Sequence, residues 1–160
     1  MPPGQKETMS GNKQVVSVLN DLLENTRDGE YGFKTCAEAV KTASAKTLFG
    51  TRAAGCAQAG RELEAMIVQY GGTPADGGTT AGALHRGWVQ VKGSVGFDSE
   101  LSILESCEKG EDSAIAHYRK ALKEEGLPAD VRALIERQAA GAQKNHDQIR
   151  DLRNVARAQS

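Results

Sequence analysis

The sequence predicts an all-α protein, and three observations carry this prediction. Aromatic residues make up only 4% of the chain, whereas alanine is frequent and glycine occurs 18 times. This composition suits closely packed helices better than a sheet core rich in β-branched and aromatic residues. Four stretches carry apolar residues at alternating spacings of three and four, which places them on one helical face. The length of 160 residues fits one domain, so we expect four long helices packed as a single bundle.

We divide the chain into one folded domain with a tail at each end. Residues 1–12 are polar and contain no apolar run, so we expect a disordered tail. It resembles neither a signal peptide nor a membrane anchor, and a cytoplasmic protein is the default expectation. Residues 13–155 are predicted to form the bundle, and residues 156–160 a short C-terminal tail.

The first helix is expected to end near Ala43. Gly29 and Gly32 lie inside it, where each costs about 1 kcal/mol relative to alanine. They indicate either close backbone approach or local room beside Glu30, or else tolerance at a surface. The predicted inward face consists of Val15, Leu19, Leu22, Thr26, Glu30, Phe33, Ala37 and Val40.

The second helix is predicted from about Ser44 to Tyr70 and ends at a Gly-Gly pair, after which a loop follows. Its apolar face keeps a period of 3.5 residues, typical of the seam of a bundle. Arg52 occupies one position on this seam. The predicted inward face consists of Ala45, Phe49, Arg52, Cys56, Ala59, Leu63, Met66 and Tyr70.

A long crossover is expected between the second and third long helices. Residues 71–98 are too many for a tight turn, and they contain one short amphipathic helix from Thr80 to about Val95. A connection of this length could carry the chain back along the bundle, since a 20-residue helix covers about 30 Å. The second and third helices would then run parallel. Trp88 either packs against the bundle or contributes to a homodimer interface.

The third helix contains a carboxylate in the middle of its apolar face. Asp98 or Ser99 is the expected N-cap, with Phe97 as a hydrophobic staple, and the helix continues to about Glu125. Burying the unpaired charge of Glu111 would cost several kcal/mol, roughly, so a partner inside the fold is required. The inward face consists of Leu104, Cys107, Glu111, Ala114, Tyr118 and Ala121.

The fourth helix is predicted to begin with Pro128 in its first turn, after Gly126 closes the third. Its apolar face is interrupted by His146, with Gln143 one turn before it. The predicted inward face consists of Val131, Ile135, Gln138, Ala142, His146, Ile149 and Leu152.

Each helix thus carries a polar residue on its apolar face, near its middle: Glu30, Arg52, Glu111 and His146. Four such residues at comparable depth indicate a shared polar centre. In four-helix bundles, metal sites are built by carboxylates and imidazoles that project inward from facing helices.

Over residues 13–155 the chain resembles the ferritin-like superfamily, and more closely a bacterial group of small four-helix-bundle proteins classed as a domain of unknown function. The resemblance implies a ferritin-like bundle with a long crossover. The stretches that carry it are VLNDLLENTRDGEYGF, GALHRGWVQVKG, ILESCEKGEDSAIAHYRKAL and QKNHDQIRDLR.

Ferritin-like di-iron proteins use a lone Glu on the first and third helices and Glu-x-x-His on the second and fourth. Glu30 and Glu111 match the lone positions. The fourth helix keeps His146 but has the amide Gln143 in place of the carboxylate, and the second helix has Arg52 and no ligand. A complete di-iron site is therefore not expected.

Two interpretations of the centre remain open. In the first, Glu30, Glu111 and His146 bind one divalent metal, such as iron, zinc or manganese, with Gln143 or water completing the shell. In the second, Arg52 replaces the metal and pairs with one carboxylate, while His146 bonds to the other. We favour the second, because a fixed cation would repel a metal. A third role for Arg52 is to extend its head outward into water.

Three cysteines, Cys36, Cys56 and Cys107, lie on or beside the inward faces of the first three helices. A free cysteine is commonly a small buried apolar residue, which is the favoured interpretation. If the second and third helices run parallel, Cys36 and Cys107 lie on the same side of the Glu111 level. Soft-metal binding or a redox pair is the alternative.

Several classes of function are disfavoured. Lys and Arg total 20 against 21 Asp and Glu, without a basic block, which argues against nucleic acid as a partner. No stretch approaches the roughly 20 apolar residues of a membrane span, and no phosphate-binding loop, serine-hydrolase or dinucleotide motif occurs. Two hypotheses remain: a metal-handling ferritin-like protein, or a non-catalytic bundle that acts through interactions, for example as a homodimer in a stress response.

Overall fold

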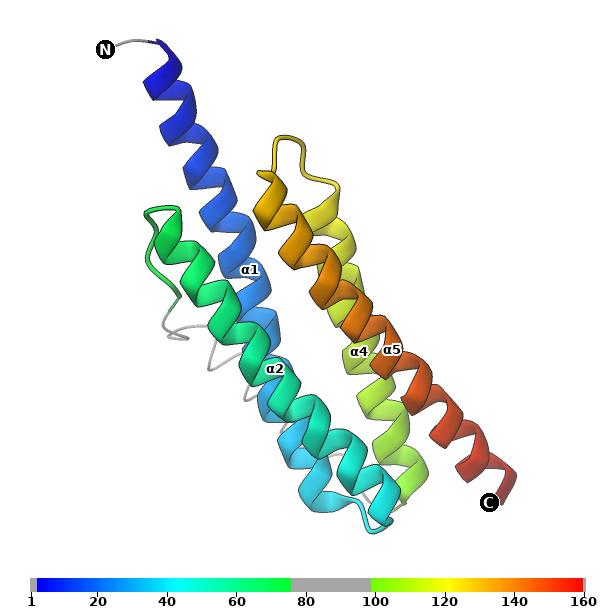
Figure 1. Ribbon diagram of the computed structural model, residues 1–160. Helices are drawn as coiled ribbons and strands as arrows, with labels where there is room; N and C mark the ends of the chain where they lie inside the picture. The colour runs from blue at the N-terminus through cyan, green and yellow to red at the C-terminus, as the bar shows by residue number, and fades with distance from the viewer. Residues whose placement is uncertain (1–2, 76–98, 160) are drawn as a thin grey trace.

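The computed structural model describes residues 3–75 and 99–159. These residues form four long helices and no strand (Figure 1), so the all-α prediction is confirmed. The predicted crossover helix, Trp88 and the capping residues Phe97 and Asp98 lie outside the described residues. The helices are α1 (Pro3–Ala39), α2 (Ala43–Gln69), α4 (Glu100–Leu122) and α5 (Ala129–Gln159).

The helices form two antiparallel hairpins, α1 with α2 and α4 with α5, packed side by side (Figure 1). The Glu100 carboxylate ties the start of α4 to the turn between α1 and α2. It accepts hydrogen bonds from the backbone N–H groups of Lys41 and Thr42, at 2.8 and 3.0 Å. It also accepts one from the Thr42 hydroxyl, at 2.8 Å. Since α2 and α4 both begin at this end, they run parallel, as the length of their connection predicted.

Both chain ends are more helical than the sequence pattern indicated. The helix α1 begins at Pro3, so residues 3–12, expected as a disordered tail, form its first turns. Proline is well tolerated in a first helical turn, and these turns extend beyond the other helices (Figure 1), where no apolar face is needed. The helix α5 runs to Gln159, through most of the expected tail 156–160. Ala156 in that stretch packs against the apolar core.

Glycines and one serine mark the helix ends. Gly71, with φ of +79°, follows α2, and the N–H of Gly72 donates to the carbonyl of Ile67 at 2.9 Å. This arrangement satisfies carbonyls at the helix end. Ser99 is the N-cap of α4, and its hydroxyl accepts a hydrogen bond from the N–H of Ser102 at 3.2 Å.

The apolar core is divided into two clusters. The upper cluster, near the turn between α4 and α5, includes Val15, Leu19, Leu22, Leu23, Leu63, Ile67, Tyr118, Ala121, Val131, Leu134, Ile135 and Ala142. The lower cluster, near the turn between α1 and α2, includes Phe33, Cys36, Val40, Ala45, Phe49, Ala53, Cys56, Ile103, Leu104, Cys107 and Ile149. Along α4, Glu111 lies between the residues of the two clusters, and it is fully buried. Within the described ranges, no helix is both long and apolar enough to cross a membrane.

Candidate functional site

The centre of the bundle is an ion pair between Arg52 of α2 and Glu111 of α4. Arg52 Nε donates to Glu111 Oε2 at 3.0 Å, and Arg52 Nη2 donates to Glu111 Oε1 at 2.8 Å. This is the two-pronged geometry for which the planar guanidinium is suited. The Glu111 side chain is 0% exposed and that of Arg52 is 13% exposed. The partner that the buried carboxylate requires is therefore this arginine.

Arg52 is held as a cation by its surroundings. Burial acts to lower the pKa of Arg52, but the neighbouring Cys56 and the hydrogen bond with Glu111 outweigh it and raise the pKa above its ordinary value. The guanidinium carbon also lies 5.8 Å from the centre of the Phe33 ring, a cation–π distance. Arg52 thus stays charged inside the bundle and does not extend its head group into water.

The second partner of Glu111 is Asn145 of α5, a residue that the sequence analysis did not select. Asn145 Nδ2 donates to Glu111 Oε2 at 2.6 Å, and Asn145 is buried. A signal for it was present in the sequence. Steps of three and four alternate strictly along Ile135, Gln138, Ala142, Asn145 and Ile149, whereas the predicted face broke this alternation to include His146.

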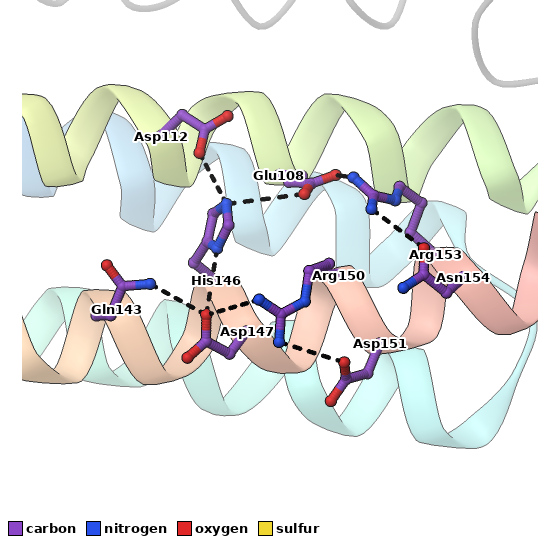
Figure 2. A network of polar contacts seen from close by, with 9 residues as sticks. All are labelled: Glu108, Asp112, Gln143, His146, Asp147, Arg150, Asp151, Arg153 and Asn154. Atoms are coloured by element: carbon purple, nitrogen blue, oxygen red, sulfur yellow. Dashed lines mark hydrogen bonds and ion pairs between the residues drawn. The ribbon is translucent and has the colours of Figure 1, made fainter.

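His146 lies outside the core, between α4 and α5 (Figure 2). Its Nε2 atom is 2.7 Å from Asp112 Oδ1 and 3.7 Å from Glu108 Oε2. Its Nδ1 atom is 3.5 Å from Asp147 Oδ1, which also accepts a hydrogen bond from exposed Gln143 at 3.0 Å. Both α5 residues of the predicted metal site therefore belong to a polar network between α4 and α5, in which the His146 side chain is 16% exposed.

Glu30 also lies away from the centre. It is partly buried and lines a shallow groove between α1 and α2 together with Lys34, Ala53 and Ala54. Strict alternation of three and four along α1 places Gly29, not Glu30, on the inward face. A Cβ atom at Gly29 would lie 3.0 Å from the Sγ atom of Cys56, so α1 presents a backbone surface where the sequence analysis expected a carboxylate.

The structure thus does not bring the four predicted ligands Glu30, Glu111, His146 and Gln143 together. Of these, only Glu111 is in the core, and its oxygens are engaged by Arg52 and Asn145. In the part of the chain that the structure describes, no group of three or more His, Cys, Asp or Glu side chains is arranged to hold a metal ion. The physical reason is the helix register: a shift of one residue turns a side chain by about 100° around the axis.

All three cysteines are buried free thiols. Burial, together with the neighbouring Cys36 thiol of α1, raises the pKa of Cys107 of α4 well above its ordinary value. Burial also raises the pKa of Cys56, to about 11, although the nearby Arg52 acts to lower it. Both Cys56 and Cys107 are therefore thiols at neutral pH, and the thiolate is the form that attacks oxidants and binds metals. These environments favour the role of small buried apolar residues.

A cavity of about 470 Å³ opens beside the ion pair, between α1 and α4. Gly29 and Gly110 contribute room because they carry no side chain. Phe33 and Tyr118 line it together with the Arg52–Glu111 pair. The sequence analysis named local room beside Gly29 as one alternative, but the size of the space results from the spacing of two helices.

Asp28 on α1 also lines this cavity. Its Oδ1 atom is buried and has no hydrogen-bond partner. Burial, with a smaller contribution from the negative charge of Glu24, raises the pKa of Asp28 to about 6, although His117 acts to lower it. Sequence reasoning missed Asp28, since it lies beside the apolar face of its helix and in no motif.

Comparison with known proteins identifies both a family and a fold. A family model described as "Domain of unknown function (DUF2383)" matches residues 14–124. No curated protein matches the sequence significantly.

Solved structures of two bacterial proteins share the fold. A mutant of Dps1 from Mycobacterium smegmatis has a TM-score of 0.77 and 18% identity, with 89% of this chain and 96% of that chain covered. The bacterioferritin-related protein from Bacteroides fragilis, described as a dodecameric thioferritin, has a TM-score of 0.76 and 17% identity. That match covers 99% of this chain and 97% of the other. The fold is therefore a ferritin-like four-helix bundle, and at these identities the likeness extends to the fold alone.

Proposed function

The chain belongs to the family described as Domain of unknown function (DUF2383), and from this premise we propose a non-catalytic, self-associating ferritin-like protein in which Arg52 replaces the metal. The observation that carries the proposal is the pair of hydrogen bonds from Arg52 to Glu111, at 3.0 and 2.8 Å. The guanidinium occupies the coordination sites that Glu111 would offer to a metal ion.

Electrostatics supports this role for Arg52. Two unit charges 4 Å apart interact with about 4 kcal/mol at an effective dielectric constant of about 20, so a divalent ion near the guanidinium would meet roughly twice that repulsion. A metal would also have to displace Arg52 and Asn145 from a carboxylate that is 0% exposed. Breaking those contacts would leave a buried cation without its counter-ion.

Metal titration tests this part of the proposal. Ferrous iron, zinc and manganese would be titrated into the purified wild-type protein, the Glu111→Gln variant and the matched Asp112→Asn variant. Calorimetry would monitor each titration, and metal analysis would give the amount of metal bound per chain. We expect no stoichiometric binding that depends on Glu111. Binding of one ion per chain that Glu111→Gln abolishes and Asp112→Asn retains would instead support the single-metal interpretation with Glu30, His146 and Gln143.

Self-association is the second part of the proposal. Its support is the fold shared with the Bacteroides fragilis protein, which is described as dodecameric. Light scattering and sedimentation would give the mass in solution, which we expect to be at least twice the 17.0 kDa of one chain. A monomer across the accessible concentration range would overturn self-association without affecting the metal result.

A further inference from the structure

Two charged side chains of α1, Glu30 and Lys34, line the shallow groove between α1 and α2. Glutamate and lysine four residues apart on a helix can pair with each other. In the stretches that the structure describes, however, neither Glu30 nor Lys34 forms an ion pair. Lys34 is exposed and Glu30 is partly buried, so the groove presents one negative and one positive charge that the bundle itself leaves unpaired.

The floor of this groove is formed by residues without long side chains. Gly50 and Ala54 of α2 are exposed to water. Where side chains are this small, a second helix can approach to the short end of the usual 8–10 Å, roughly, between helix axes. The groove is therefore shaped to receive a helix. Its floor consists of Ala37 of α1 and Gly50, Ala53, Ala54 and Ala57 of α2.

Polar contacts lie beyond both ends of the groove. Towards the upper cluster, the Arg27 guanidinium pairs with Glu64 at 3.1 Å. Towards the lower cluster, Lys46 Nζ donates to the carbonyl of Ala37 at 3.1 Å. Between these contacts α1 contributes residues 30–37, about two helical turns or roughly 11 Å. An occupant therefore meets the groove over a short stretch of one helix.

The order of the charges indicates a second copy of α1 as the occupant. When two identical helices run antiparallel across a two-fold axis, their contacts are reciprocal. With the axis at the level of residue 32, Glu30 meets Lys34 of the partner subunit, and Lys34 meets Glu30 of the partner subunit. A parallel arrangement would instead place like charges opposite each other, which is unfavourable. Tyr31, 36% exposed, lies next to this axis, and tyrosine is a residue type enriched at interfaces.

We propose that the groove between α1 and α2 is a two-fold interface between copies of this chain, in which two α1 helices run antiparallel and Glu30 pairs with Lys34 of the partner subunit. The inference rests on self-association, the second part of the proposed function, and adds to it the surface and the arrangement of the copies. Charge pairs of this kind determine orientation and register more than affinity.

Charge reversal tests the reciprocal pairing. Sedimentation would give the concentration at which half of the wild-type assembly dissociates. Glu30→Lys and Lys34→Glu should each raise this concentration by at least about ten-fold, since each places like charges opposite one another. The double variant should return it to within about three-fold of wild type, because reversing both charges preserves the pairing. Single variants that weaken assembly without recovery in the double variant would overturn the antiparallel pairing.

Two reversals on the other hairpin are matched controls. Glu136→Lys and Lys144→Glu change exposed residues of α5 and alter the net charge by the same amounts. They should leave the dissociation concentration unchanged, and circular dichroism should show that all variants remain helical. Equal weakening by these controls would attribute the effect to net charge and would overturn the interface.

A steric variant tests the close approach without changing Glu30 or Lys34. Ala54→Arg places a long side chain on the exposed floor of the groove, and should raise the dissociation concentration by at least about ten-fold, since a clash opposes association. The matched Ala140→Arg variant, at an exposed alanine of α5, should leave it unchanged.

The two levels of the proposal fail in different ways. A monomeric wild-type protein would overturn self-association and this interface with it. A wild-type assembly that both Glu30→Lys and Ala54→Arg leave intact would overturn the interface alone, and self-association would then use another surface.

Discussion

Two polar networks lie one residue apart on the same two helices. Glu111 and Asn145 face the core, where they meet Arg52, while the next residues in the chain, Asp112 and His146, meet each other between α4 and α5 (Figure 2). The chemistry of the two networks is similar, since each pairs a carboxylate with nitrogen donors. The two networks differ in how far their carboxylates are exposed to water: the Glu111 side chain is 0% exposed, whereas that of Asp112 is 61% exposed and that of Glu108, the second carboxylate near His146, is 13% exposed.

This difference determines what each network contributes to the fold. Breaking a buried charge pair leaves an unpaired charge in a medium that solvates it poorly. Breaking an exposed pair returns two charges to water at little cost. The core network should therefore be essential to stability, and the surface network nearly dispensable. Substitutions at neighbouring positions test this contrast directly.

The largest effect is expected for Arg52→Ala. This change strands the Glu111 carboxylate among apolar residues, and should lower the free energy of unfolding by about 3–5 kcal/mol, as measured by chemical denaturation. Replacing both partners, Arg52→Met with Glu111→Leu, should recover most of the loss, because no unpaired charge then remains. If Arg52→Ala unfolds at the wild-type denaturant concentration, the pair is not buried as described.

A smaller loss is expected for Asn145→Ala. Glu111 loses the donor that lies 2.6 Å from its Oε2 atom but keeps both bonds from Arg52. A hydrogen bond to a charged group contributes about 1.5–3 kcal/mol, so denaturation should show a loss of about 2 kcal/mol. The matched His146→Ala variant should lose clearly less, since His146 contacts partly exposed carboxylates. Equal losses in the two variants would remove the distinction between core and surface.

The same neighbouring positions show how far the sequence could predict this protein. The length of the connection between the second and third long helices gave their parallel direction, and apolar periodicity gave the four helices, because helix formation and burial depend on pattern. Periodicity also placed Arg52 and Glu111 on inward faces. The prediction failed between Asn145 and His146 and between Gly29 and Glu30, since adjacent residues on a helix differ by about 100° in direction. We selected His146 and Glu30 because their side chains can bind metals, although strict spacing pointed to their neighbours.

Other features could not be predicted from periodicity. The cavity beside the ion pair and the unpartnered Oδ1 atom of Asp28 depend on how α1 and α4 are spaced in three dimensions. The helical state of residues 3–12 has no apolar face to reveal it. Both are properties of packing and local propensity rather than of the hydrophobic pattern.

Asp28 provides a case intermediate between the two networks. Its pKa is raised from 3.8 to about 6, so the folded state binds a proton more tightly than the unfolded chain does. Stability from this group is present below about pH 4 and is lost as pH rises through about 6. Asp28→Asn should therefore be more stable than wild type at about pH 8, by roughly 1 kcal/mol once solvent screening of this half-exposed group is allowed for. Thermal melts across this range should show the gap closing towards about pH 4, and a gap of constant size would contradict the linkage.

The smallest effect is expected for Asp112→Asn, which removes the charge 2.7 Å from His146 Nε2. Exposed ion pairs are typically worth about 0–1 kcal/mol, so denaturation should give a loss below about 1 kcal/mol.

Salt sharpens the contrast further. The Debye length falls from about 10 Å at 0.1 M to about 3 Å at 1 M salt, which should nearly abolish the small loss in Asp112→Asn at a pH where His146 is protonated and the pair is charged. The loss in Arg52→Ala should persist, because salt does not enter the site of a carboxylate that is 0% exposed. A loss in Arg52→Ala that also disappears in 1 M salt would mean that water and ions reach the central pair, and the two networks would then differ only in position.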